Sequence, residues 1–317
     1  MLAAVLAMVL FATSSVTARR SVARLGPASA NFWRILTATV ALAVFSHGWG
    51  RGLGGVGWGW YVVSGLVGYG IGDFGIFRAL PLLGARLSSL MTQCLAAPLA
   101  AAFEWCWRGT ILSTGELVAG GVILSGVALA LSGGENRRVD GSPRRIPGWG
   151  IVFGILGAAG QAGGAVLSRH GMHVAENGGA LVGGYANGLS VAYQRILPGL
   201  AFGAAWWLLD LARSSPVRIS KNMPFDRRAL PWVVANGLVG PFLGVGFYQQ
   251  ALHDLPTGVV MSIVALTPLA VIPLSMLIEK EHPSRWSVLG GVIAVAGATY
   301  LVGGFRALAQ WGAGFPP

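Results

Sequence analysis

Charged side chains inside long apolar stretches are the residues of this sequence that could do chemistry, because a charge there is costly and usually functional. Arg195 lies deep in the longest apolar stretch, within YANGLSVAYQRILPGL (185–200). A guanidinium in such a place can hold the carboxylate or phosphate of a ligand through paired hydrogen bonds. The structural alternatives are an ion pair with Asp73 and a side chain that extends to the membrane surface.

Asp73 is the one aspartate well inside an apolar stretch, and it supports two hypotheses. Burial disfavours the charged form of a carboxylate, so Asp73 could carry a coupled proton. It could equally form an ion pair that holds two helices together. Arg34 occurs in FWR, which matches the YQR that contains Arg195. We therefore group Arg34 with Asp73 as a candidate for proton coupling or a structural ion pair, although its place near the start of its stretch favours the membrane interface.

Uncharged polar and aromatic side chains in the same stretches are further candidates for ligand binding. Gln93 and Gln161 fall near the middle of their stretches, where we expect a cavity, and Trp33 and Tyr185 could stack on an aromatic or cationic solute. Hydrogen bonds between helices and packing against lipid are the alternatives. The candidate binding residues are Arg195, Gln93, Gln161, Asn187, Trp33, Tyr185, Asn236 and Tyr248, with Gln194 and Gln249 as additional polar groups.

The remaining motifs argue against an enzyme or a metal site. GYGIGD (68–73) contains the GxGD of intramembrane aspartyl proteases, but that chemistry needs a second carboxylate to share a proton, and no second aspartate lies well inside an apolar stretch. His170-x-x-His173 alone is a weak metal signal, and the chain has no Walker A motif. We therefore predict no catalytic residue, no metal ligand and no cofactor.

The elements that position these residues follow from composition. Of 317 residues, 54% are hydrophobic and 10% are charged, whereas a soluble protein carries roughly 25% charged residues. This excludes a soluble enzyme domain, a disordered chain and a disulfide-stapled secreted module. The net charge of +11 does not indicate nucleic-acid binding, because the basic residues lie in short gaps between apolar runs. The composition indicates a polytopic membrane protein.

Membrane-spanning helices need about 20 mostly apolar residues, and the sequence has ten such runs. Tryptophan, which favours the membrane interface, occurs near many of their ends. The predicted spans are 2–18, 30–46, 60–80, 87–105, 115–132, 149–168, 183–207, 231–251, 257–278 and 286–304.

An internal duplication relates the two halves of the chain. The alignment that sets Trp60–Leu80 on Trp232–Leu252 makes 9 of 21 residues identical, including GLVG in both copies. A slightly smaller offset aligns Pro98-Leu99-Ala100 with Pro268-Leu269-Ala270. Ten spans in two copies give five per copy, and an odd number makes the second copy enter the membrane from the opposite side. Such inverted repeats are typical of secondary transporters, with a site between the halves.

The basic residues are sorted by side. Sixteen of the 22 lie in the odd-numbered loops, four on the other side, and Arg34 and Arg195 within spans. The positive-inside rule then places the odd-numbered loops in the cytoplasm and both termini outside.

Three short motifs are informative beyond the repeat: FATSSVTARR at the end of the first span, FWRI (32–35) and the Pro–Leu of each fourth helix. In these motifs the sequence resembles the drug/metabolite transporter superfamily, in particular its ten-helix EamA-type exporters. LTPLAVIPLSMLIEKEHPSRW (266–286) resembles the family's proline helix, acidic turn and next helix, with Glu281 at the acidic position. The first copy reads WRGTIL (107–112) there and lacks the acid. Members of this family are usually drawn with cytoplasmic termini, which differs from the charge pattern.

We therefore predict an all-α membrane protein with ten transmembrane helices in two inverted five-helix repeats around a central cavity. The expected parts are 1–132, a basic connection at 133–148, 149–304 and a tail at 305–317. The resemblance implies a secondary exporter or exchanger of small metabolites, such as amino acids, that works by alternating access. A membrane-embedded enzyme acting on a lipid or a lipid-linked substrate is the alternative, and a channel is the third class. The expected partners are the lipid bilayer of a bacterial-type inner membrane and a small molecule, with proton coupling as one hypothesis and a monomer or weak homodimer as the assembly.

Overall fold

The computed structural model describes most of the chain as helix. It describes residues 1–108, 114–132, 136–137, 143–144, 146–179, 185–213, 227–254, 263–279 and 283–301. Most of the connection 133–148 and the predicted tail 305–317 lie outside these ranges, as do Glu281 and the side chains of Tyr185 and Gln249.

The first half of the chain contains α1 (Leu2–Leu25), α2 (Pro27–Gly48), α3 (Trp58–Gly65), the π-helical segment η1 (Leu66–Gly72), α4 (Asp73–Arg108) and α5 (Thr114–Ser132). α3, η1 and the first part of α4 run as one continuous helix. α4 breaks at Gly84, whose φ of 83° is available to glycine but strained for other residues. The break supplies the turn that the sequence predicted between the third and fourth spans, so α4 contributes to two of them.

The second half contains α6 (Gly148–Asn177), α7 (Tyr185–Arg213), η2 (Arg227–Ala229), α9 (Leu230–Gly237), the π-helical η3 (Leu238–Gly244), α10 (Val245–Asp254), α12 (Thr267–Glu279) and α13 (Arg285–Leu301). Two-residue strands β1 (Asn136–Arg137) and β2 (Pro143–Arg144) pair antiparallel between the halves, as a small exception to the all-helical prediction. α6 continues past its predicted end at residue 168, so His170 and His173 lie in the helix rather than after it.

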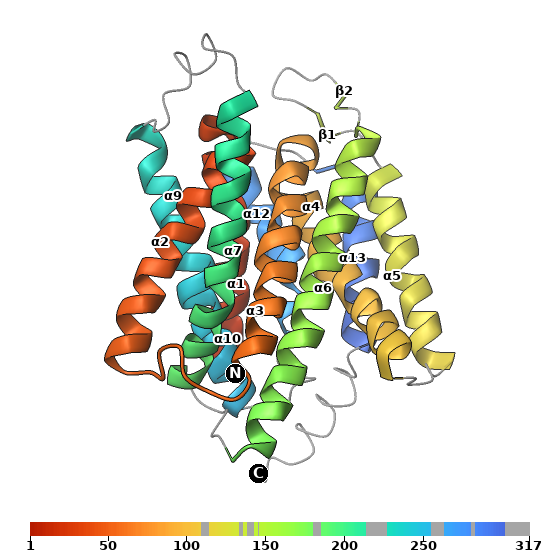
Figure 1. Cartoon of the computed structure of the whole chain (residues 1–317). Helices are drawn as coiled ribbons and strands as arrows, with labels where there is room; N and C mark the ends of the chain where they lie inside the picture. Colours follow the sequence, from red (N-terminus) through yellow and green to blue (C-terminus); the bar gives the residue numbers. More distant parts are fainter. Residues whose placement is uncertain are drawn as a thin grey trace.

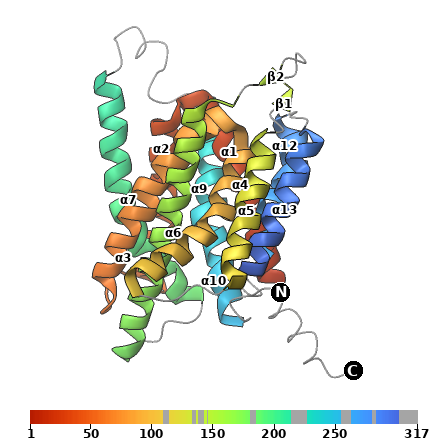
Figure 2. The ribbon, with the colours of Figure 1, turned by 90° about the vertical axis from the view of Figure 1, so that its right-hand side faces the viewer.

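Within the described residues, five helices are long and apolar enough to cross a membrane: Leu2–Leu25, Pro27–Gly48, Trp58–Trp107, Gly148–Asn177 and Arg227–Tyr248. Trp58–Trp107 crosses twice because of the break at Gly84. α5, α7, α12 and α13 complete the bundle of ten spans, in which the helices lie roughly side by side (Figures 1 and 2). Large apolar side chains such as Val44 and Leu277 are exposed on the outside, as expected of a surface that contacts lipid.

The two repeats are inverted. In Figure 1, α1 begins at the lower end of the bundle and α6, its counterpart, begins at the upper end. The π-helical segments show the same relation in detail. α9, η3 and α10 begin at the positions that the repeat alignment, with Trp60 on Trp232, pairs with the starts of α3, η1 and α4. The duplication predicted from sequence therefore extends to an unusual local conformation, which is found at the same place in both copies.

Glycines let the backbones of neighbouring helices touch. η1 packs against α6, and a Cβ on Gly164 would lie 2.9 Å from the Cα of Gly68, too close for either backbone to tolerate. α5 and α13 lie together at one edge of the bundle, with Gly126 facing Ala294 across the contact (Figures 1 and 2). The chain has 49 glycines in 317 residues, and part of this high content is therefore explained by helix contacts between the repeats.

Replacing Gly164 by alanine should destabilise the protein. The added methyl group would press on the η1 backbone, and overpacking of this kind costs about 1–3 kcal/mol. Gly121→Ala is the matched control, because a Cβ on Gly121 meets no atom within 4 Å. Thermal unfolding in detergent should show a lower midpoint for Gly164→Ala only, and equal midpoints would contradict the close contact.

Candidate functional site

The site is built where η1 crosses α6 and α7. A π-helical turn leaves some backbone carbonyls without their usual helical partners, and such turns are frequent at functional sites. Here the carbonyl of Gly68 accepts a hydrogen bond from Nε2 of Gln161, at 3.3 Å. Gln161 is half-buried on α6 at this crossing. Asp73 follows directly after the π-helical segment.

Arg195 reaches the same crossing from α7. Its Cζ lies 5.6 Å from the centroid of the Tyr69 ring, within the range of a cation–π contact. Its Nε is buried and has no hydrogen-bond partner among the described residues. The guanidinium also interacts electrostatically with Tyr61 and Tyr248. Arg195 is thus a fixed cation inside the bundle, surrounded by aromatic rings and backbone.

Arg34 is a buried side chain rather than an interfacial one. Only 8% of its surface is exposed, and it forms a hydrogen-bonded ion pair with Asp73. Its Cζ also lies 4.9 Å from the centroid of the Phe77 ring. The prediction that Arg34 lies at the membrane interface is therefore wrong, because the carboxylate of Asp73 on the adjacent helix compensates its charge within the bundle. Asp73 forms its ion pair with Arg34 and not with Arg195.

The two internal arginines occupy equivalent positions in the two repeats. A Cβ on Gly65 would collide with the carbonyl oxygen of Arg195, and a Cβ on Gly237 would lie 2.7 Å from the carbonyl oxygen of Arg34. Gly65 and Gly237 are themselves paired by the repeat alignment, as the first residues of the two GLVG sequences. The backbone of each arginine therefore contacts the equivalent glycine of the other repeat.

The acid of the ion pair is present in only one repeat. The repeat alignment places Val245 where the first repeat has Asp73. Val245 packs with Tyr69 against an apolar cluster that includes Ala192 and Ile196 of α7, on either side of Arg195 in sequence. In the part of the chain that the structure describes, no carboxylate forms an ion pair with Arg195. The second repeat thus keeps the cation but has valine at the position of the acid, and Asp73 of the first repeat interacts with Arg195 electrostatically without an ion pair.

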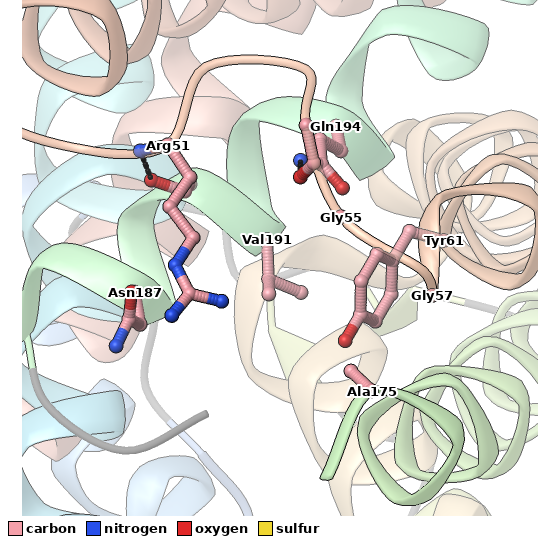
Figure 3. Close-up of a pocket in the computed structure, with 10 residues that line it drawn as sticks. Arg51, Gly55, Gly57, Tyr61, Ala175, Asn187, Val191 and Gln194 are labelled. Carbon is pink, nitrogen blue, oxygen red and sulfur yellow. Dashed lines mark hydrogen bonds between the residues drawn. The ribbon is translucent and has the colours of Figure 1, made fainter. Parts of the chain in front are cut away.

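A pocket lies beside this site, between the two repeats. It is lined by the connection after α2, by Tyr61 of α3, by the end of α6 and by the first turns of α7 (Figure 3). The lining residues are Arg51, Gly54, Gly55, Gly57, Tyr61, Ala175, Asn187, Ser190, Val191 and Gln194. Two predicted polar candidates, Asn187 and Gln194, are therefore in the pocket. Sequence reasoning did not single out Arg51, for which the one signal is a lone arginine in a glycine-rich connection.

The other predicted binding residues fall into two groups. Tyr248 lies close enough to Arg195 to interact electrostatically, and Gln93 is half-buried on α4. Asn236 is fully buried and donates hydrogen bonds to Ser14 and Thr17 of α1, so it has the structural role that was the alternative.

Of the predicted aromatic residues, Trp33 packs in an aromatic cluster away from Arg195. Trp33 packs against Phe32 and Trp207, with ring centroids 5.2 and 6.0 Å away. Tyr185 begins α7, and its side chain lies outside the described part of the chain. In that described part, no three His, Cys, Asp or Glu side chains gather in a way that could hold a metal ion.

Comparison with known proteins identifies both the sequence family and the fold. The model of the EamA-like transporter family matches residues 1–132 and 148–303. The fold matches a solved structure with the description "Crystal structure of protein", with a TM-score of 0.61 and 19% sequence identity. The match covers 98% of this chain and 97% of the other chain. No curated protein matches the sequence.

Proposed function

This chain belongs to the EamA-like transporter family, and from that membership we propose that it is a secondary exporter or exchanger of amino acids or related small metabolites. The family makes it an integral, multi-pass membrane transporter of small molecules. The proposal adds the substrate class, the site and the mechanism, with repeats at 1–132 and 149–304 in a bacterial-type inner membrane.

The proposed substrate site depends on the positive charge of Arg195. Its Nε is buried inside the bundle, its equivalent Arg34 forms an ion pair with Asp73, and no carboxylate of the described residues forms an ion pair with Arg195, although Asp73 also interacts with it electrostatically. A carboxylate brought by the substrate would complete the ion pair, because a guanidinium holds a carboxylate through two parallel hydrogen bonds. Gln161, which donates to Gly68 at the same crossing, and Tyr248, which interacts with Arg195 electrostatically, would contact the remainder of the substrate.

Alternating access is the mechanism that fits this placement. The site lies at contacts between the repeats, since Gly65 of the first repeat touches Arg195 of the second. Rocking of one repeat against the other would open this crossing to each face of the membrane in turn. Helices bend most easily at breaks and at internal prolines. In this chain these places include Gly84, Pro98 and Pro273.

Counterflow in proteoliposomes tests the function. Vesicles loaded with an unlabelled amino acid or carboxylate metabolite should accumulate the same labelled compound from outside, because a carrier exchanges one for the other. A channel would equilibrate the label without accumulation, and an enzyme would show neither. Failure of a broad panel of amino acids and metabolites would contradict the proposal.

A further inference from the structure

Arg51 is a second cation that faces the space between the repeats. It lies in the connection between α2 and α3, lines the pocket and is exposed. Figure 3 shows its guanidinium between Asn187 and Val191, away from its own backbone connection. Among the described residues, no carboxylate forms an ion pair with it. An arginine without a counter-ion at the mouth of a pocket is available to an anion from solution.

The connection that carries Arg51 is held firmly against α7. The backbone N–H of Arg51 donates to Oγ of Ser190 at 3.0 Å. Nε2 of Gln194 donates to the carbonyl oxygens of Gly52 and Gly54, at 3.0 and 2.9 Å. Gly52, with a φ of 57°, lets the chain turn tightly between these anchors. The position of the arginine is therefore set by α7, the helix that also carries Arg195.

The pocket and Arg195 lie along one path. On α7, Asn187, Ser190 and Gln194 follow one another on successive turns and end next to Arg195, about 12 Å along the helix from Asn187. On the facing helix, Tyr61 lines the pocket and is one turn before Gly65, which touches Arg195.

The Tyr61 side chain interacts electrostatically with both arginines, Arg51 and Arg195. It also interacts with Glu176, which lies beside His173 near the end of α6. Gly57 and Gly171 pack closely against the Tyr61 ring and hold it in place. An anion that leaves Arg51 for Arg195 would pass this ring.

We propose that Arg51 is an outer anion-binding residue, which holds the carboxylate of the substrate at the mouth of the pocket before transfer past Tyr61 to Arg195. This inference rests on the proposed function. It adds a second binding position for the substrate and the direction from which the substrate approaches Arg195. Asn187 lies in the first turn of α7, where the positive end of the helix dipole adds to the charge of Arg51. The ligand chemistry is a small carboxylate or phosphate, free in solution.

The transport kinetics of Arg51→Gln test whether Arg51 is an outer anion-binding residue. The variant is reconstituted in phosphatidylcholine vesicles, which contain no anionic lipid, and exchange is measured with a solute that gives counterflow. We expect the KM for solute supplied at the pocket face to rise about tenfold, the equivalent of one charge-assisted hydrogen bond, with kcat unchanged. The dependence of KM on salt should also weaken, because a steering charge has been removed.

Two controls separate charge from position. Arg51→Lys, which keeps the positive charge, should keep the KM near that of the unaltered protein. Arg213→Gln, which removes an exposed arginine at the far end of α7, should leave the KM unchanged. An unchanged KM in Arg51→Gln, or an effect that occurs only when anionic lipid is present, overturns the proposal. The second result would mean that Arg51 binds a lipid phosphate.

A binding measurement distinguishes this proposal from the proposed function. Thermal unfolding of the detergent-solubilised protein is followed with glutamate and with inorganic phosphate as probes. If either probe stabilises the unaltered protein and this stabilisation disappears in Arg51→Gln, the result supports anion binding by Arg51 even where no solute is transported. Stabilisation that is equal in both proteins contradicts it even where transport is found.

Discussion

Substitution of Arg195 by glutamine should abolish transport while the protein still folds. Glutamine keeps a polar side chain but removes the guanidinium, with which no carboxylate of the described residues forms an ion pair. Loss of the ion pair with the substrate would lower exchange by a factor of about 100 or more, since ionic hydrogen bonds in buried sites contribute roughly 3 kcal/mol. Initial rates of counterflow and the yield of folded protein are measured together.

A protein carboxylate placed beside Arg195 gives the complementary test. Val245→Asp restores in the second repeat the acid that Asp73 supplies in the first. The new carboxylate should compete with the substrate for Arg195, so transport falls although no part of the site is removed. Val245→Asn has the same shape without the charge and should transport normally. Equal rates for the two variants, or full activity of Arg195→Gln, would remove Arg195 from the binding site.

Loss of the acid in the other repeat should instead damage the fold. Asp73→Asn leaves Arg34 charged and 8% exposed, with no counter-ion inside the bundle. Removing one partner of a buried ion pair costs about 3–5 kcal/mol, because the remaining charge is uncompensated. Chemical unfolding in detergent should show this loss, together with a low yield of folded protein.

The double variant Arg34→Met with Asp73→Leu distinguishes a structural pair from a proton carrier. Replacing both charges by apolar side chains of similar volume is often neutral or stabilising, so the double variant should regain the stability lost in Asp73→Asn. If the pair is structural, transport and its response to a pH gradient return as well. Recovered stability with lost response to the gradient would instead assign proton coupling to Asp73.

Much of the fold was readable from sequence because it depends on local composition. Apolar runs of sufficient length define membrane spans whatever their neighbours are, and identities such as GLVG at residues 65–68 and 237–240 reveal the duplication directly. The structure adds that both copies contain a π-helical segment at this point, which no pattern of apolar residues could predict. Arg195 and Asp73 were recognisable as candidates since a charge within an apolar run is conspicuous by itself.

The pairing of those charges was decided only by the tertiary structure. Arg34 and Arg195 are equivalent in the sequence repeat, and both were available to Asp73. Packing between helices brings Asp73 to Arg34 as an ion pair, whereas no carboxylate of the described residues forms an ion pair with Arg195. Asn236 was likewise indistinguishable from a binding residue until the fold placed it against Ser14 and Thr17. The sequence alone thus determined which groups are costly to bury, whereas their partners depend on which helices meet, and that is a property of the folded chain.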